Sequence, residues 1–168
     1  MESWQVAAVG AVATTLGILT RFRRGLRPPK RLVQPRPPYP GDFDGRVDLE
    51  YHPHLDGDPD PGEIVWTWVP FEEDHSMGKD RPVLLIGREG SWLLGLMLTS
   101  KDHDNDRNHA DRWLDIGTGP WDPKRRPSEV RLDRIIRINP GAVRREGAVV
   151  PRATFEAVSR SLFRIHNW

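Results

Sequence analysis

The chain has 168 residues, and the 16 prolines and 15 glycines among them indicate one small domain with extended segments attached to it. The lack of cysteine excludes structural disulfides, zinc sites built from cysteine and thiol nucleophiles. The formal net charge of +1 hides a segregated pattern, because residues 21–36 carry only basic charges and residues 42–74 carry acidic charges with Arg46 as the sole cation. A nucleic-acid site in this chain must therefore be a local cluster of cations.

The first segment of the chain is uncharged and apolar. Residues 5–20 read QVAAVGAVATTLGILT, between Trp4 and Phe22, and a helix that spans a bilayer needs roughly 20 apolar residues. A basic run follows, which by the positive-inside rule places the rest of the chain in the cytoplasm. We predict an N-terminal apolar helix over residues 1–22 that enters the membrane through residues 4–22 and anchors the protein to the inner face of the cell membrane. A helix packed on protein is the alternative.

Residues 23–60 have the composition of a linker. Six prolines lie between residues 27 and 45, and proline favours an extended, semi-rigid chain. Residues 46–51 alternate apolar and polar side chains, as an edge strand does, and an acidic loop follows them. We predict that the whole segment is a basic and proline-rich, then acidic, tether.

The folded domain is expected to span residues 61–168. Runs of apolar, β-branched and aromatic residues between turn-forming residues predict strands, which cover residues 64–69, 83–86, 92–99, 113–116 and 129–138. A helix is predicted over residues 151–166, because Pro151 suits a first helical turn and the apolar side chains that follow have helical spacing. Short strands closed by a helix indicate a mainly β fold, a small barrel.

Two residues at strand ends have side chains that bind phosphate. Arg81 directly precedes Pro82 at the start of an apolar run, and the planar guanidinium can donate two hydrogen bonds to one phosphate. The alternative is a surface cation that pairs with Asp80 or Glu72. Thr99 ends another apolar run and offers a hydroxyl, although threonine is common at strand ends for structural reasons.

A cation and a carboxylate also occur two residues apart. Arg131 and Asp133 lie in a predicted strand, so their side chains share one face. That places a charge stabiliser beside a base, and stabilisation is the role expected of Arg131 because the pKa of arginine exceeds about 12. The alternative is an ion pair within the strand, worth at most about 1 kcal/mol if it is exposed.

Two polar loops contain side chains that bind metals. The first holds His52, His54, Asp56 and Asp58, and the second holds Asp102, His103, Asp104, Asp106 and His109. The second opens like a calcium loop, but Arg107 and Trp113 stand where glycine and glutamate are needed. We interpret both loops as solvated and predict no metal site and no cofactor. A divalent-metal nuclease that uses the second loop is an alternative.

Four short sequence motifs follow one another along the domain. They read Gly62-Glu63-Ile64-Val65-Trp66, Arg81-Pro82-Val83-Leu84-Leu85-Ile86, Leu96-Met97-Leu98-Thr99-Ser100 and Val130-Arg131-Leu132-Asp133. Their order resembles the PemK/Kid/MazF family of toxins from type II toxin-antitoxin systems, over about half of the chain. The resemblance implies an SH3-like barrel and a metal-independent endoribonuclease that cleaves single-stranded RNA or mRNA. The implied products carry a 2′,3′-cyclic phosphate and a 5′-hydroxyl.

The resemblance also implies roles for individual residues. In the family an Arg-Pro pair follows a flexible loop and its Arg contacts the scissile phosphate, which corresponds to Arg81. A Thr that bonds phosphate corresponds to Thr99, and an Arg-x-Asp pair with Asp as base corresponds to Arg131 and Asp133. His75 stands in the loop where some members use a His for RNA contact or proton handling. The implied partners are single-stranded RNA, a second copy of the chain in a homodimer, and a cognate antitoxin whose extended tail covers the groove.

A function without catalysis is the main alternative. Acidic loops around the candidate residues repel phosphate; they contain Glu72, Glu73, Asp74, Asp102, Asp104 and Asp106. A membrane-tethered SH3-like barrel that binds nucleic acid or protein, and cleaves nothing, has the same sequence features.

Overall fold

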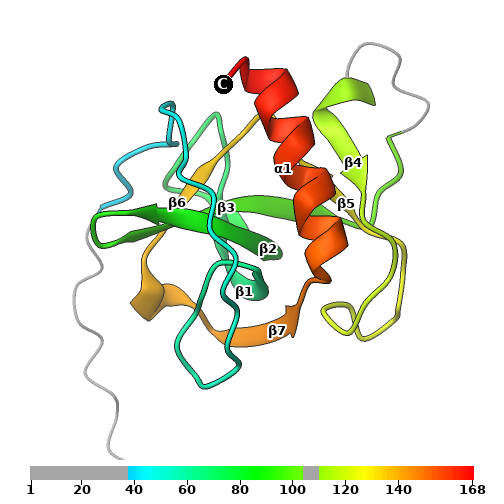
Figure 1. Ribbon diagram of the computed structural model, residues 1–168. Helices are drawn as coiled ribbons and strands as arrows, with labels where there is room; N and C mark the ends of the chain where they lie inside the picture. Colours follow the sequence, from blue (N-terminus) through cyan, green and yellow to red (C-terminus); the bar gives the residue numbers. More distant parts are fainter. Residues whose placement is uncertain (1–37, 104–109) are drawn as a thin grey trace, which may run out of the picture. The chain divides into compact units, whose positions relative to one another are not determined.

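A computed structural model describes residues 38–103 and 110–168 (Figure 1). The apolar N-terminal segment lies outside these residues, so the expected membrane helix over residues 4–22 stays a prediction. Among the helices of the described part, none has the length and apolar character that crossing a bilayer requires.

Three consecutive strands form the centre of the domain. β1 (Glu63–Pro70), β2 (Gly78–Glu89) and β3 (Trp92–Thr99) make two antiparallel hairpins. Leu84 and Ile86 belong to one apolar cluster, whereas Val83 and Leu85 belong to a second cluster on the opposite face. Because both faces are buried, these strands read as nearly continuous apolar runs. The strands predicted here are confirmed.

Shorter strands extend the sheet on both sides. They are β4 (Trp113–Asp115), β5 (Glu129–Arg131), β6 (Ile136–Ile138) and β7 (Arg145–Val149). The sheet order is β4-β5-β3-β2-β1-β7, with β6 alongside β3. Two single-turn 3₁₀ helices, η1 (Ala110–Arg112) and η2 (Pro140–Ala142), precede β4 and β7. The result is a strongly bent half-barrel, which confirms the mainly β fold (Figure 1).

The single strand predicted over residues 129–138 is wrong at its centre. β5 pairs with Leu98 and Thr99 at the end of β3, whereas β6 pairs with residues 93–95 at its beginning. The chain must bend between β5 and β6 to reach both ends of β3. A continuous apolar alternation therefore covers two strands that are separated by a turn.

The C-terminal helix α1 (Arg152–His166) covers one face of the half-barrel (Figure 1). Phe155, Val158 and Leu162 are buried and are spaced three and four residues apart, so they form a single stripe along the helix. They join the same apolar cluster as Leu84 of β2. This helix confirms the one predicted over residues 151–166.

The residues before β1 pack on the half-barrel, which differs from the tether expected over residues 23–60. We call residues 38–60 the strap. Val47 is buried in the core under α1, and the amide of Phe43 donates to the carbonyl of Ile135 at 2.8 Å. No strand forms over residues 46–51 in this part of the structure, where the Glu50 amide bonds the Ile86 carbonyl at 3.0 Å. The strap is ordered because its apolar side chains complete the core.

Candidate functional site

Arg81 and Thr99 lie at the same end of the central hairpin. β2 and β3 pair antiparallel, with Val83 opposite Met97. Arg81 and Thr99 each lie two residues beyond that pair, so their side chains are on the same face of the sheet. Both border a hollow of about 180 Å³. The other polar side chains around it are those of Asp80, Ser100, Asp122, Arg126 and Ser128. The fold thus brings together two residues that the sequence places 18 positions apart.

The guanidinium of Arg81 has no hydrogen bond or ion pair to any residue within 38–103 or 110–168. The two acids expected to compete for it are engaged elsewhere. Arg144 donates from Nε to Oδ1 of Asp80 at 2.7 Å, and Arg131 donates from Nη1 to Oε2 of Glu72 at 2.8 Å. The interpretation of Arg81 as a surface cation in an ion pair is therefore not realised. A half-buried, unpaired cation beside a hollow is a candidate binding group for an anion.

Thr99 presents a hydroxyl whose hydrogen is not committed among the described contacts. Its Oγ1 accepts a hydrogen bond from the Lys101 amide at 3.1 Å. This bond shapes the turn that follows β3 and leaves the hydroxyl hydrogen to donate toward the hollow. Ser100 is the exposed neighbour and borders the same hollow.

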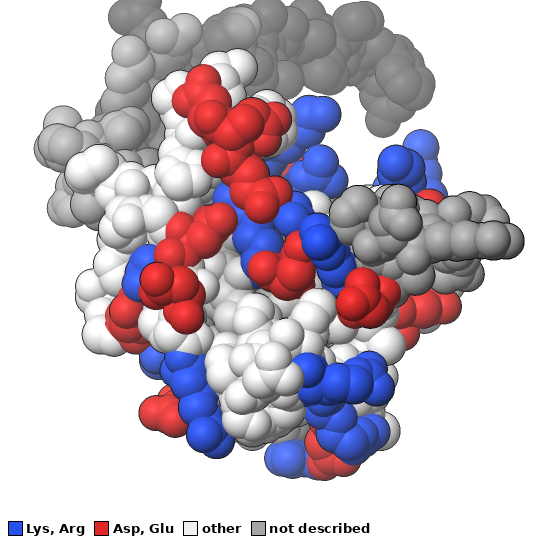
Figure 2. Space-filling view, turned by 90° about the horizontal axis from the view of Figure 1, so that it is seen from above, with Lys and Arg blue, Asp and Glu red and all other residues white. Residues whose placement is uncertain are grey.

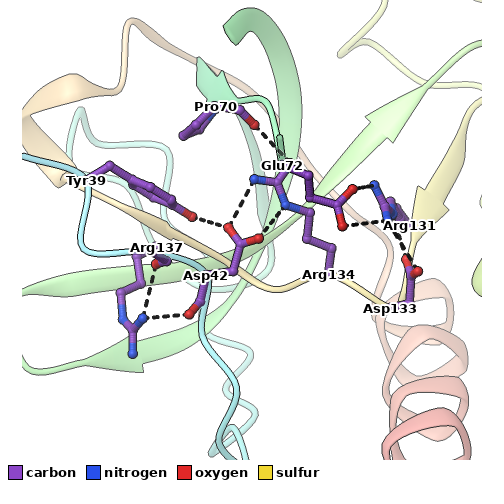
Figure 3. A network of polar contacts seen from close by, with 9 residues as sticks. Tyr39, Asp42, Pro70, Glu72, Arg131, Asp133, Arg134 and Arg137 are labelled. Atoms are coloured by element: carbon purple, nitrogen blue, oxygen red, sulfur yellow. Dashed lines mark hydrogen bonds and ion pairs between the residues drawn. The ribbon is translucent and has the colours of Figure 1, made fainter. Parts of the chain in front are cut away.

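Arg131 and Asp133 form the pair that the sequence predicts. Arg131 donates from Nε to Oδ1 of Asp133 at 2.6 Å (Figure 3). Nη1 of Arg112 lies 3.4 Å from the other carboxylate oxygen. Thr99 is paired with Glu129, two residues before Arg131, so Arg131 follows on the same face about 7 Å further along. Neither member of the pair borders the Arg81 hollow.

Glu72 neutralises Arg131 from the loop between β1 and β2. Its carboxylate accepts bonds from both terminal nitrogens of the guanidinium, at 2.8 and 3.3 Å (Figure 3). Burial opposes the charge of Arg131, but the bonds to Asp133 and Glu72 outweigh the burial and raise the pKa of Arg131 above its ordinary value. Arg131 therefore stays charged and is suited to stabilising negative charge, not to giving up a proton.

His75 does not border the hollow. Its ring packs edge-on against Tyr39 of the strap, with the ring centroids 4.9 Å apart. The strap is held in turn by Arg134, which donates two bonds to Asp42, at 2.7 and 3.0 Å, and one to the carbonyl of Pro70, at 2.9 Å (Figure 3). The fold does not bring His75 to Arg81 and Thr99.

A second arginine at the hollow was not predicted. Arg126 borders it and donates from Nε to Oδ2 of Asp122 at 2.6 Å. The hydrogen bond from Arg126 outweighs burial and lowers the pKa of Asp122, which keeps this carboxyl ionised. The run Lys124-Arg125-Arg126 was the available signal, but no strand or motif in the sequence connects it to Arg81.

A histidine-glutamate pair lies next to the hollow. His103 Nδ1 is 2.6 Å from Oε2 of Glu129, the residue paired with Thr99, and the His103 ring stacks on Trp113 at 3.9 Å. A carboxylate on Nδ1 fixes the tautomer that leaves Nε2 to accept a proton. The sequence suggested His103 only as a stray metal ligand, because its distance from Glu129 along the chain hides the pairing.

The surface charge agrees with a local site. Figure 2 shows basic and acidic side chains intermingled across the face seen from above, without a continuous basic area. Binding of a polyanion to this face must therefore depend on particular arginines.

Comparison with known proteins identifies the family. A family model described as the PemK-like, MazF-like toxin of type II toxin-antitoxin systems matches residues 60–166. None of the curated proteins matches the sequence.

Two solved structures are similar to part of this chain at low sequence identity. One is an endoribonuclease in complex with its cognate antitoxin from a mycobacterial species, with 18% identity over 63% of this chain and 92% of that chain and a TM-score of 0.46. The other is MazE-MazF from Deinococcus radiodurans, with 16% identity over 65% of this chain and 96% of that chain and a TM-score of 0.47. The assignment depends on the family model, which spans more than half of the sequence. The chain belongs to the PemK-like, MazF-like toxins of type II toxin-antitoxin systems.

Proposed function

We propose that this protein is a metal-independent endoribonuclease toxin that cleaves single-stranded RNA or mRNA. The observation that carries the proposal is the guanidinium of Arg81, unpaired among residues 38–103 and 110–168, beside the hydroxyl of Thr99 at one hollow of a chain from this toxin family. An anion with the size and charge of a backbone phosphate matches these two donors.

The chemistry needs three contributions. The 2′-hydroxyl must lose a proton, the phosphorane must be stabilised, and the 5′-oxygen must gain a proton. Arg81 and Thr99 hold the scissile phosphate in the hollow, while Arg131 stabilises charge from its place further along the same face. Attack by the 2′-hydroxyl breaks the bond to the 5′-oxygen, so the products end in a 2′,3′-cyclic phosphate and a 5′-hydroxyl.

Proton transfer has two candidate carriers. Asp133 is the base implied by the family pattern, but its oxygens are bonded to Arg131 and approached by Arg112 in this structure. It must be released from these groups before it accepts a proton. His103 is already oriented by Glu129 and lies next to the hollow, so it serves as the second carrier. His75 assists only after its loop leaves Tyr39.

The partners follow from the same site. An antitoxin with an extended tail inhibits the toxin by placing a carboxylate where the phosphate of RNA binds, because both anions suit Arg81 and Thr99. We further propose a homodimer, and a membrane anchor through residues 4–22 that keeps the domain at the inner face of the cell membrane.

The test compares two substrates with the full chain in excess EDTA. One is a mixed-sequence single-stranded RNA, and the other is the same sequence with 2′-deoxyribose throughout. Cleavage of the RNA alone, with cyclic phosphate ends, supports the proposal. Cleavage of both strands, or cleavage that EDTA abolishes, contradicts it. Binding of RNA without cleavage favours the non-catalytic barrel, which the neutralisation of Arg131 by Glu72 also suits.

A further inference from the structure

A cluster of metal-binding side chains lies on the strap, away from the hollow at Arg81. His52, His54 and Asp60 each offer one ligand atom, and these atoms lie within 4.8 Å of one another. His52 Nδ1 is 3.9 Å from one oxygen of Asp60, and His54 Nδ1 is 3.9 Å from the other. The two histidines precede the stretch that the family model matches, so the family assigns nothing to them. The sequence suggested Asp56 and Asp58 as their partners, but the fold brings Asp60 to them.

The backbone around this cluster is fixed by a buried carboxylate. Glu63 begins β1 and is fully buried. Its Oε1 accepts the amide of His54 at 2.8 Å, and its Oε2 accepts the amide of Asp60 at 3.2 Å. The amide of His52 bonds the carbonyl of Pro61 at 3.1 Å. The three side chains therefore start from a backbone that is held in place before any ligand binds, which lowers the ordering cost of binding.

A second carboxylate orients one of the histidine rings. His52 Nε2 lies 2.9 Å from Oε2 of Glu50. When Nε2–H donates to Glu50, the neutral Nδ1 has a free lone pair that faces Asp60. A carboxylate on the distal nitrogen of a histidine is the usual outer contact of a metal-bound imidazole.

We propose that His52, His54 and Asp60 bind a divalent transition-metal ion, and that Zn²⁺ fits this set of two imidazoles and one carboxylate. A tetrahedral zinc site with bonds of about 2.0–2.1 Å separates its ligand atoms by roughly 3.4 Å. The ligand atoms, which lie within 4.8 Å of one another, must therefore move closer together when the ion binds. The exposed ring of His54 must also give up its bond to the His52 carbonyl. Water completes the coordination, and the bound ion joins His52 and His54 to Asp60, the last residue of the strap before β1.

Arg88 is expected to weaken metal binding, so its removal provides a control with the opposite effect to removal of a histidine. Its Nη2 donates to Oδ1 of Asp60 at 2.8 Å and to the carbonyl of Pro59 at 3.1 Å. This cation competes for the carboxylate and repels a second positive charge. Removing it is expected to strengthen the binding of metal, whereas removing a histidine is expected to weaken it.

The experiment is a Zn²⁺ titration of the full chain, prepared without a polyhistidine tag, in competition with a chromophoric chelator. One ion is expected to bind per chain. His52→Ala and His54→Ala should each weaken binding by about 10- to 100-fold or more, and Arg88→Gln should strengthen it several-fold. Asp58→Asn is the matched control, because it removes an exposed acid of the same loop and leaves the proposed ligands intact.

Thermal unfolding with and without Zn²⁺ distinguishes an effect on folding from an effect on metal binding. Thermal unfolding without metal should be the same for the parent and the histidine variants, whose altered side chains are exposed. Added Zn²⁺ should then raise the Tm of the parent and not that of these variants. No saturable binding to the parent, or an affinity in both histidine variants equal to that of the parent, overturns the proposal. Neither result bears on RNA cleavage, which is tested in EDTA.

Discussion

Glu72 and Arg131 form a bidentate ion pair that joins the β1–β2 loop to β5. Both terminal nitrogens of the guanidinium donate to the carboxylate, at 2.8 and 3.3 Å (Figure 3). The third guanidinium nitrogen of Arg131, Nε, donates a hydrogen bond to Oδ1 of Asp133. An RNA phosphate that uses Arg131 must therefore displace Glu72, so this loop acts against substrate binding.

Glu72→Gln is expected to increase kcat/KM for single-stranded RNA. Glu72 is largely exposed, and such a pair is worth at most about 1 kcal/mol, which limits the gain to roughly five-fold. The measurement is cleavage rate at several salt concentrations, and the gain should shrink as salt rises. Glu73→Gln is the matched control, since the partners of Arg131 among the described residues are Glu72 and Asp133 and not this exposed neighbour. A decrease in Glu72→Gln, or an equal increase in both variants, contradicts the prediction.

Thr99→Val is expected to lower cleavage by about 10- to 100-fold. The change keeps the shape of the side chain and removes a hydroxyl that donates to a charged phosphate, a bond worth about 1.5–3 kcal/mol. Ser100→Ala removes the neighbouring hydroxyl at the same hollow and should have a smaller effect. The measurement is the single-turnover cleavage rate of each variant. A larger loss of rate in Ser100→Ala than in Thr99→Val would show that Ser100, and not Thr99, binds the phosphate.

His103→Gln tests proton transfer. A positioned acid or base contributes about 10²–10⁴-fold, so cleavage should fall and one limb of the pH–rate profile should disappear. Glu129→Gln should change the same limb, because Glu129 holds the ring of His103 at 2.6 Å. His75→Ala is the comparison, since that ring packs on Tyr39 and should leave the profile in place. An unchanged profile in His103→Gln returns the role of base to Asp133.

Asp42→Asn is expected to destabilise the protein in a pH-dependent way. Burial of Asp42 raises its pKa, but bonds from Arg134 and Tyr39 outweigh the burial and lower the pKa below 3.8. A lowered pKa in the folded state stabilises the protein above the ordinary pKa and loses this stabilisation as the pH falls. The variant should lose about 1–2 kcal/mol of unfolding free energy near pH 7, since Arg134 is buried and Asp42 only partly so.

The measurement is urea unfolding of both proteins at pH 7 and near pH 3. The difference between parent and Asp42→Asn should shrink at the lower pH, because the stabilisation that a lowered pKa provides is lost as the pH falls. Asp44→Asn changes an exposed neighbour and should stay within about 0.5 kcal/mol at both pH values. A difference that grows as the pH falls contradicts the assignment.

Much of the fold is predictable from local patterns. The central hairpins and α1 have long apolar runs or helical spacing, and both signals depend on neighbouring residues. The docking of the strap is different, because the contact of Phe43 with Ile135 joins distant parts of the chain. Pro38 and Pro40 indicate an extended chain, and neither lies in a helix or strand. Extension alone does not show whether a segment is free or packed.

The candidate site divides in the same way. The positions of Arg81 and Thr99 follow from the order of the motifs and from one antiparallel register. The pairing of Glu72 with Arg131 and the position of Arg126 depend on the conformation of loops. The periodicity of apolar residues in the sequence does not predict loop conformation. The sequence therefore predicts the ends of the strands and misses the loop residues that complete or block the site.

The most direct test is cleavage of a mixed-sequence single-stranded RNA by the full chain in excess EDTA, beside Arg81→Ala and Arg88→Ala. Both arginines lie in β2, and Arg88 is an exposed residue near the other end of the strand. The parent and Arg88→Ala should cut the RNA, and Arg81→Ala should cut it about 10²–10³-fold more slowly. Equal cutting by all three proteins, or no cutting by a well-folded parent, would contradict a ribonuclease site built on Arg81.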